Sequence, residues 1–265
     1  MHHPIVNVAI DAARKAGDII TRALERLDEV KLYKKPGNSY TTDADIRAEQ
    51  AIIKILQKSY PDYGLLCEES GETPGYDTEY TWIVDPIDGT TNFIHGYPHF
   101  CVSIALKQGD TIQHGVIYDP IRQELFTATR GRGSQLNSRR LRVAQSRKLD
   151  GSLISISFRH APVPLARSEE IRQSLTQKVS GIRRSGSAAL DLAYVAAGRL
   201  DAMAGWGLAP WDIAAGTLLV QEAGGVITEP PGCEPFFQSG CLLAANAVMI
   251  APLLQAMNPR ASNPS

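Results

Sequence analysis

The chain lacks several features that would place it in a specialised class. No uninterrupted apolar run approaches the roughly 20 residues that cross a bilayer, and the N-terminus has no basic stretch followed by a long apolar run, as a signal peptide would. The 27 basic and 28 acidic residues leave a formal charge of −1, so no overall field attracts nucleic acid or an anionic membrane. We therefore expect a cytoplasmic protein with no membrane partner.

Cysteine is also scarce, and no nucleophile motif is present. The four cysteines show no Cys-x-x-Cys spacing, which argues against zinc and against a disulfide framework and favours free thiols in a reducing cytosol. There is no Gly-x-Ser-x-Gly sequence, and no cysteine is placed with a histidine and a basic phosphate loop. A reaction through a covalent enzyme intermediate is therefore not indicated.

What the chain does contain is a globular composition of 43% hydrophobic and 21% charged residues. Apolar spacing predicts helices over residues 5–27, after Asp45, and over 187–197 and 212–223. It predicts an antiparallel meander from 102 to 127 and strands at 153–156, 226–228 and 242–244, with a loop at 34–39. These blocks favour stacked α/β layers rather than a regularly alternating doubly wound sheet. A polar break at 145–151 suggests an N-terminal half, 1–148, and a C-terminal half, 149–265.

The most informative segment is 82–92, a short apolar strand that ends in Asp85 and Asp88 and continues into a Gly-Thr-Thr turn. Carboxylates at a strand end suit Mg²⁺, which takes oxygen ligands together with substrate phosphate. Backbone N–H groups where the turn opens a helix suit the phosphate itself. The alternative is ordinary turn chemistry, because Asp, Pro and Gly all favour turns.

Two further acidic positions favour the metal interpretation. Glu68 follows the apolar residues 64–66 and so stands at the end of a second predicted strand. Asp212 precedes a helical pattern, where its alternative role is that of an N-cap. Acidic side chains at strand ends and at a helix start, together with the glycine-threonine turn, form a candidate metal constellation.

Taken together, these segments resemble the inositol monophosphatase family in order and spacing, and the resemblance covers almost the whole chain. The segments that carry it are Glu68-Glu69-Ser70, Asp85-Pro86-Ile87-Asp88-Gly89-Thr90-Thr91-Asn92-Phe93, Trp211-Asp212-Ile213-Ala214-Ala215-Gly216, and the stretches at 42–45, 181–189 and 222–225. The resemblance implies a five-layer α-β-α-β-α sandwich and a Mg²⁺-dependent phosphomonoesterase acting on inositol 1-phosphate or a similar small phosphorylated polyol. It also implies a homodimer and sensitivity to lithium.

The resemblance assigns roles to individual residues. It implies that one metal is held by Glu68, Asp85 and the carbonyl of Ile87, and a second by Asp85, Asp88 and Asp212. Asp45 would orient the hydroxyl of Thr90, which helps to activate the attacking water, although Asp45 also suits a helix cap. Gly89 and Thr90 would bind phosphate through their backbone N–H groups. Either Lys34 or Lys35 would lie in a loop that closes near the site.

On the substrate side, the resemblance places Gly186, Ser187 and Ala188 near the polyol. A glutamate seven residues before the Trp-Asp aspartate often accepts hydrogen bonds from ring hydroxyls in the family, and here that position is Gly205. Without this acceptor the preference for inositol is in question, because buried polar groups carry much of such specificity. Related substrates are fructose 1,6-bisphosphate, 3′-phosphoadenosine 5′-phosphate and histidinol phosphate.

Residues 127–149 provide an alternative function, because they carry seven Lys or Arg residues and no Asp or Glu. A solvated hairpin and linker is the simpler interpretation. The other is a docking surface for nucleic acid or for an acidic, transcription-related protein partner. The segment has no aromatic residues, which argues against stacking on single-stranded RNA.

Overall fold

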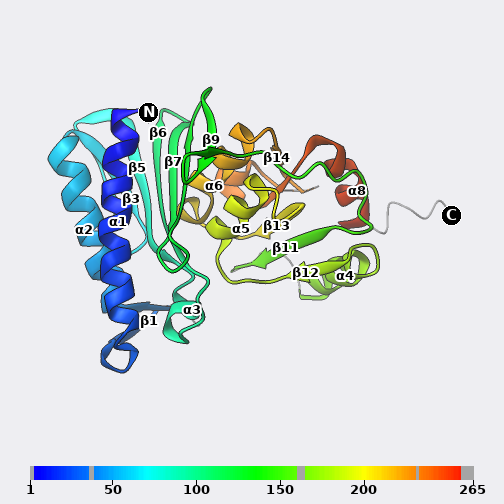
Figure 1. The fold of residues 1–265 in the computed structure, drawn as a ribbon, viewed down its shortest axis with the longest axis horizontal. Helices are drawn as coiled ribbons and strands as arrows, with labels where there is room; N and C mark the ends of the chain where they lie inside the picture. Colours follow the sequence, from blue (N-terminus) through cyan, green and yellow to red (C-terminus); the bar gives the residue numbers. More distant parts are fainter. Residues whose placement is uncertain (1–2, 36–38, 160–164, 231–232, 258–265) are drawn as a thin grey trace.

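The computed structural model describes residues 3–35, 39–159, 165–230 and 233–257. Figure 1 shows the layers in order: helices, a large sheet, helices, a second sheet and further helices. The predicted α-β-α-β-α arrangement is therefore confirmed. The helices are α1 (Pro4–Leu24), α2 (Asp43–Ser59), α3 (Thr90–Ile94), α4 (Leu165–Thr176), α5 (Ala188–Ala196), α6 (Pro210–Glu222), α7 (Phe236–Ser239) and α8 (Ala247–Met257), with a 3-10 turn at Leu27–Glu29.

The strands form an eight-stranded sheet, a five-stranded sheet and a separate hairpin. The first sheet has the order β10-β9-β8-β7-β6-β5-β3-β4, and the second the order β12-β11-β13-β15-β14. The bounds of the strands are β1 (Leu32–Lys35), β2 (Ser39–Thr42), β3 (Tyr63–Cys67), β4 (Gly71–Thr73), β5 (Asp77–Asp88), β6 (Cys101–Gln108), β7 (Thr111–Asp119), β8 (Glu124–Thr129), β9 (Gly133–Leu136), β10 (Arg139–Arg140), β11 (Leu153–Phe158), β12 (Gly181–Arg183), β13 (Ala202–Trp206), β14 (Val226–Thr228) and β15 (Leu242–Ala245).

The outer layer beside the first sheet is formed by α1 and α2. Ile5, Ala9, Ala16 and Ile20 recur at helical spacing on α1 and are buried. The helix ends at Leu24, earlier than predicted, because the backbone leaves the helical region at Arg26 (φ −136°, ψ 51°) before a separate 3-10 turn.

The first sheet contains the predicted meander, since β6, β7 and β8 pair antiparallel in sequence order. Its other feature is the parallel pair β3 and β5, in which Cys67 lies opposite Val84. The next residue, Glu68, donates its backbone N–H to the Val84 carbonyl at 3.1 Å. This register brings Glu68 beside Asp85, although the two are far apart in sequence.

The predicted loop at 34–39 is wrong at its ends, because β1 and β2 pair as an antiparallel hairpin with Lys35 opposite Ser39. Residues 36–38 lie outside the described part of the chain. Lys34, Lys35 and Ser39 are polar, yet they lie in strands because β1 and β2 satisfy each other's backbone N–H and C=O groups.

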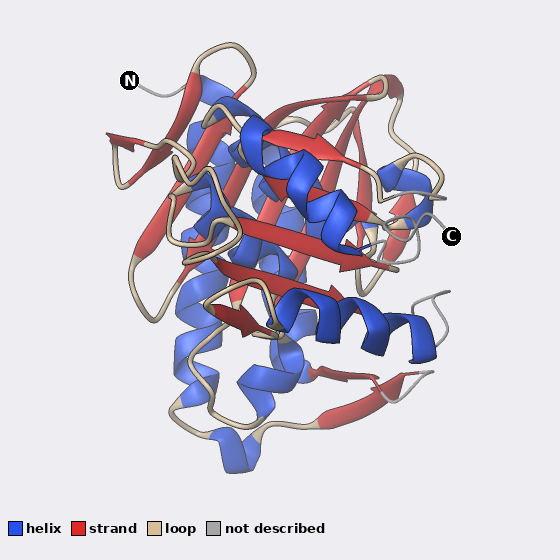
Figure 2. Ribbon diagram, turned by 90° about the vertical axis from the view of Figure 1, so that its right-hand side faces the viewer, coloured by secondary structure: helices blue, strands red, loops and turns tan. Residues whose placement is uncertain are grey.

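In the second sheet, β11 is parallel to both β12 and β13, so these three strands end at the same edge. Figure 2, viewed from the side of α4 and α8, shows the second sheet crossing in front of the first. The apolar pattern predicted β11, β14 and β15, and it missed the short β12 and the Gly-containing β13.

Helices α5 and α6 lie between the sheets and join the two parts of the chain. The central core combines Ile83 and Phe126 of the first sheet with Leu192 of α5 and Leu218 of α6. The division into halves at residue 148 stays a prediction, and this core takes residues from both. All four cysteines are free thiols. Within the described residues, every helix is too short or too polar to span a membrane.

The contact between α5 and α6 predicts a stability effect at Gly216. A Cβ atom added there would lie 2.5 Å from Cβ of Leu192, so Gly216→Val should lower the free energy of unfolding by about 1–3 kcal/mol through overpacking. Urea titration measures the loss. Gln221→Val, on the exposed side of the same helix, is the matched control, and equal losses in both variants would contradict the packing argument.

Candidate metal and phosphate site

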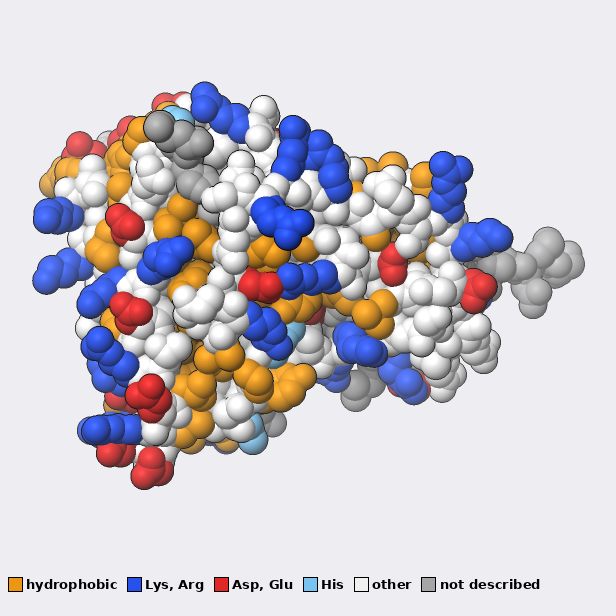
Figure 3. Space-filling view, in the orientation of Figure 1, with side chains coloured by type: hydrophobic (Ala, Val, Ile, Leu, Met, Phe, Trp, Pro, Cys, Tyr) orange, Lys and Arg blue, Asp and Glu red, His pale blue; other side chains and the backbone are white. Residues whose placement is uncertain are grey.

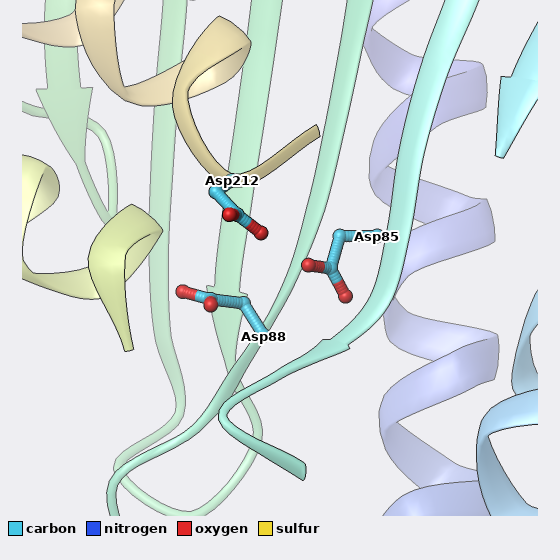
Figure 4. A group of neighbouring side chains, drawn as sticks. All are labelled: Asp85, Asp88 and Asp212. Atoms are coloured by element: carbon cyan, nitrogen blue, oxygen red, sulfur yellow. The ribbon is translucent and has the colours of Figure 1, made fainter. Parts of the chain in front are cut away.

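Three buried carboxylates from separate parts of the chain converge between the two sheets. Asp85 and Asp88 lie at the C-terminal end of strand β5, and Asp212 lies in the first turn of helix α6. One carboxylate oxygen of each lies within 4.8 Å of the others, and Figure 4 shows the three side chains pointing into a shared space. The structure thus brings together the three residues that the resemblance assigns to one metal.

The chain supplies hydrogen bonds to part of this buried charge. Asp88 Oδ2 accepts from the hydroxyl of Ser187 at 2.6 Å and from the backbone N–H of Ala189 at 2.7 Å. Asp85 Oδ1 accepts from the backbone N–H of Ile87 at 3.0 Å. Asp85 Oδ2, by contrast, is buried without a hydrogen-bond partner in the described structure. A buried acceptor of this kind is costly unless something binds it.

Asp212 is not the N-cap of its helix, because α6 begins earlier, at Pro210. Its Oδ2 accepts from the backbone N–H of Ala209 at 2.8 Å, which fixes the carboxylate, and its Oδ1 faces Arg159. Proline suits the first turn of a helix, which explains the earlier start.

Arg159 was not predicted, yet it is central to the cluster. It follows β11, and its guanidinium donates to Asp212 Oδ1 at 2.6 Å and to Glu68 Oε1 at 3.0 Å. Lys35 adds a second cation, with Nζ at 2.8 Å from Glu69 Oε1 and 3.4 Å from Glu68 Oε1. Of the two predicted lysines, Lys35 is therefore the one at the site. No sequence motif marks Arg159, because its position in the site depends on where β11 ends relative to the neighbouring strands of the sheet.

Asp45 makes the contacts that both of its suggested roles require. Its Oδ2 accepts from the backbone N–H of Thr42 at 2.8 Å and so caps α2, while its Oδ1 accepts from the hydroxyl of Thr90 at 3.1 Å. The same hydroxyl lies 3.1 Å from the carbonyl oxygen of Ile87. Gly89 precedes it with φ +105°, and a Cβ there would lie 3.0 Å from the His99 carbonyl. The turn therefore requires glycine.

The carboxylate cluster, Arg159 and the Gly89–Thr90 turn line a pocket of about 420 Å³. Of the predicted substrate-side residues, Gly186 and Ala188 line it, whereas Ser187 is buried and directs its hydroxyl to Asp88. Gly205 is buried within β13, and Leu208 fills its place: a Cβ at Gly205 would lie 2.5 Å from Leu208 Cδ1. A larger hollow of about 620 Å³ beside α1 and α2 shares no lining residue with this pocket.

Two other polar side chains hold the loops around the pocket, and neither was predicted. The amide of Asn92 donates to the carbonyls of His99 at 2.7 Å and Ser185 at 2.8 Å, joining the Gly89 turn to the Gly186 loop. The carboxylate of Glu49 accepts from the backbone N–H groups of Glu69 at 2.8 Å and Ser70 at 2.9 Å. Their sequence signal is weak, because isolated Asn and Glu residues on helices are usually solvated.

Burial raises the pKa values of Asp45, Asp85 and Asp88. The pKa of Asp88 rises to about 7 through burial and the charge of Asp212, despite its hydrogen bonds to Ser187 and Ala189. The pKa of Asp45 also rises to about 7, again mainly through burial. Burial and the charges of Glu68, Asp88 and Asp212 raise the pKa of Asp85. Bringing these carboxylates together therefore costs free energy that a bound cation would offset.

The layered fold with a buried carboxylate cluster between its sheets defines a protein of the inositol monophosphatase and fructose-1,6-bisphosphatase fold class. A family model described as "Inositol monophosphatase family" matches residues 1–260. The chain belongs to the inositol monophosphatase family.

Individual relatives agree with this assignment. Nus factor SuhB of Pseudomonas aeruginosa is 46% identical over 261 residues, covering 97% of this chain and 96% of the relative. The crystal structure of extragenic suppressor protein suhB from Bartonella henselae is 43% identical with a TM-score of 0.92, covering 96% of this chain and 98% of that one. Inositol monophosphatase from Anabaena (Nostoc) sp. PCC 7120 is 36% identical with a TM-score of 0.81, covering 96% and 94%.

The raised pKa values predict how stability depends on pH when metal is removed with EDTA. Between the ordinary Asp pKa of 3.8 and about 7, the folded protein holds protons on Asp45 and Asp88 that the unfolded chain has released. Stability should therefore fall as the pH rises through that window. Asp88→Asn should raise stability at pH 8 by about 1 kcal/mol or more, since one pKa unit corresponds to about 1.4 kcal/mol. Melting temperatures at pH 5 and pH 8 measure both effects, and a wild-type protein more stable at pH 8 than at pH 5 would contradict the prediction.

Proposed function

We propose that the protein is a Mg²⁺-dependent phosphomonoesterase that hydrolyses inositol 1-phosphate or a similar small phosphorylated polyol by attack of an activated water. The observation that carries the proposal is the convergence of Asp85, Asp88 and Asp212 in one pocket with the Gly89–Thr90 turn. Membership of the inositol monophosphatase family supports the same activity.

The residues present fit a hard divalent cation. All the side-chain ligands are carboxylates, the ligand type that Mg²⁺ prefers, and Asp85 Oδ2 is buried with no hydrogen-bond partner within the described residues. Glu68, Asp85 and the carbonyl of Ile87 would hold one ion, and Asp85, Asp88 and Asp212 a second. Bound there, the metal would lower the pKa of a water and offset the charge on the reacting phosphate.

The Gly89–Thr90 turn and Asp45 would bind the phosphate and move the proton. The backbone N–H groups of Gly89 and Thr90 would bind phosphate oxygens, because the first N–H groups of a helix have no acceptor within it. The hydroxyl of Thr90 can take a proton from the attacking water while it gives its own to Asp45 Oδ1, 3.1 Å away. A pKa of about 7 suits Asp45 to accept that proton near neutral pH.

Family membership also supports three finer proposals. The protein would act in the cytoplasm, form a homodimer and be inhibited by lithium. Fructose 1,6-bisphosphate, 3′-phosphoadenosine 5′-phosphate and histidinol phosphate are the alternative substrates. One structural relative of 25% identity is itself titled an inositol monophosphatase-fructose 1,6 bisphosphatase.

Release of phosphate tests the activity directly. Wild-type protein with Mg²⁺ should release phosphate from inositol 1-phosphate, assayed beside glycerol 2-phosphate and the three alternative substrates. Asp88→Asn should lower turnover by about 100-fold or more, because it removes a metal ligand without opening a cavity. Asp11→Asn, at an exposed position of α1, controls for the loss of one carboxylate.

If the protein prefers another compound of the panel, the proposed hydrolysis stands and the proposed substrate is replaced. Normal turnover by Asp88→Asn at saturating Mg²⁺ would overturn the ligand assignment. No release from any compound, by protein that binds Mg²⁺, would overturn the phosphatase proposal.

A second candidate function is binding of RNA or of an acidic protein through the basic segment 127–149. Its cations are all exposed and lie at and beyond the β8–β10 edge of the first sheet: Arg130, Arg132, Arg139, Arg140, Arg142, Arg147 and Lys148. Figure 3 shows Lys and Arg side chains along the upper side of the molecule, over the region labelled β9 and β14 in Figure 1. The relatives named Nus factor SuhB carry a name that suggests a role in transcription, which favours this candidate as an additional role.

A gel shift with an unstructured RNA across a salt series tests this role. Binding through phosphates should weaken steeply between 50 and 200 mM salt, and Arg139→Gln/Arg140→Gln should weaken it about tenfold. The exposed pair Arg172→Gln/Lys178→Gln removes the same charge elsewhere and should have little effect. Equal weakening by both double variants would indicate only a nonspecific effect of net charge.

A further inference from the structure

One wall of the pocket is formed by residues that follow the parallel strands β11 and β12, and it meets the carboxylate cluster at Arg159. β11, β12 and β13 end at one edge of the second sheet, and Arg159 and Arg184 follow the first two of them directly. Both arginines line the pocket, together with Phe158 and Leu208. Arg184 Nη2 lies 3.4 Å from the carbonyl oxygen of Phe158, the residue next to Arg159. This edge of the pocket, called the rim below, therefore carries the guanidinium groups of Arg159 and Arg184.

This wall is poorly suited to a neutral polyol. Leu208, an apolar residue that lines the pocket, fills the position that a side chain at Gly205 would occupy, so that position supplies no acceptor. All the pocket-lining carboxylates within the described residues, Glu68, Asp85, Asp88 and Asp212, belong to the candidate metal site. A guanidinium group only donates hydrogen bonds, so these two side chains can donate to the lone pairs of a ring hydroxyl but cannot accept its O–H, whereas an anion uses their donors and their charge together.

Arg159 is held in place while keeping donors for a ligand. Its bonds to Asp212 and Glu68 fix the plane of the guanidinium, and the group has more N–H donors than these two bonds use. About a third of its side chain, 34%, remains exposed. A second cavity of about 290 Å³, lined by Lys35, Arg159, Leu208 and Trp211 among others, adjoins the pocket at Arg159. There is thus both space and positive charge beyond the reacting phosphate.

We propose that the substrate carries a second anionic group on its leaving group, a phosphate or a carboxylate, and that Arg159 and Arg184 bind it. This inference rests on the proposed phosphatase function and narrows its substrate from phosphorylated neutral polyols such as inositol 1-phosphate to phosphorylated compounds with a second anion. The reacting phosphate lies at the Gly89–Thr90 turn, and the second anion lies at the rim formed by the ends of β11 and β12. Charge-assisted hydrogen bonds to guanidinium groups select such a substrate over a neutral one of the same size.

Matched pairs of compounds test the proposal. Glycerol 3-phosphate and 3-phosphoglycerate differ by a hydroxymethyl group against a carboxylate, and fructose 1-phosphate and fructose 1,6-bisphosphate differ by a second phosphate. We expect wild-type protein with Mg²⁺ to have the higher kcat/KM for the anionic member of at least one pair. The pair that shows the preference identifies the anion as a carboxylate or a phosphate.

Variants assign the preference to the rim. Arg159→Gln and Arg184→Gln should each reduce the ratio of kcat/KM between anionic and neutral members about tenfold, mainly through KM for the anionic member. Arg159→Lys, which keeps the charge, should restore part of the ratio. Arg183→Gln removes a neighbouring exposed arginine that does not line the pocket, and the ratio should stay as in wild type. Should Arg159→Gln fail to fold, Arg184→Gln decides the question.

Different outcomes would overturn the inference and the proposed function. Wild-type protein that hydrolyses neutral members as well as anionic ones would overturn the inference and leave the phosphatase intact. So would a preference that neither Arg159→Gln nor Arg184→Gln changes. Absence of Mg²⁺-dependent release from every compound, including inositol 1-phosphate, would overturn the phosphatase itself.

Discussion

The structure depends on keeping several carboxylates buried close together. Desolvation and mutual repulsion both oppose this, as the raised pKa values of Asp85 and Asp88 record. The opposing donors come from distant elements: Ser187 and Ala189 at the start of α5, and Arg159 after β11. Two sheets and the helices between them must therefore be correctly placed before this charge is stabilised.

The layered fold meets that requirement by joining its parts at the site. Helices α5 and α6 pack on the first sheet through an apolar core, and their first turns deliver Ser187 and Asp212 to the end of β5. Asn92 holds the Gly89–Thr90 turn to the Gly186 loop from the other side. The same contacts that stabilise the fold thus set the distances in the pocket, because a packed core deforms little.

Sequence reasoning predicted the layered fold class, the meander and the long helices, since these follow from apolar spacing over many residues. It also singled out Asp85, Asp88 and Asp212, because strand ends and turns have a local signature. It did not find Arg159, whose place depends on where three parallel strands end, or Leu208, which reaches the pocket only because Gly205 leaves room. Strands β12 and β13 were missed because each contains glycine and neither has consecutive β-branched or leucine residues, whereas the equally short β14 and β15 do. Helix α1 was predicted too long because its apolar spacing continues past Arg26.

The bond from Ser187 and Ala189 to Asp88 also bears on how the protein is made. A ribosome that has reached residue 148 has synthesised every strand of the eight-stranded sheet and both aspartates of β5, but none of the donors that α5 supplies. At that length the chain contains Asp85 and Asp88 but not Ser187 and Ala189, the residues that donate hydrogen bonds to Asp88. The carboxylate cluster is thus completed late in translation, and a product that stops before α6 lacks Asp212.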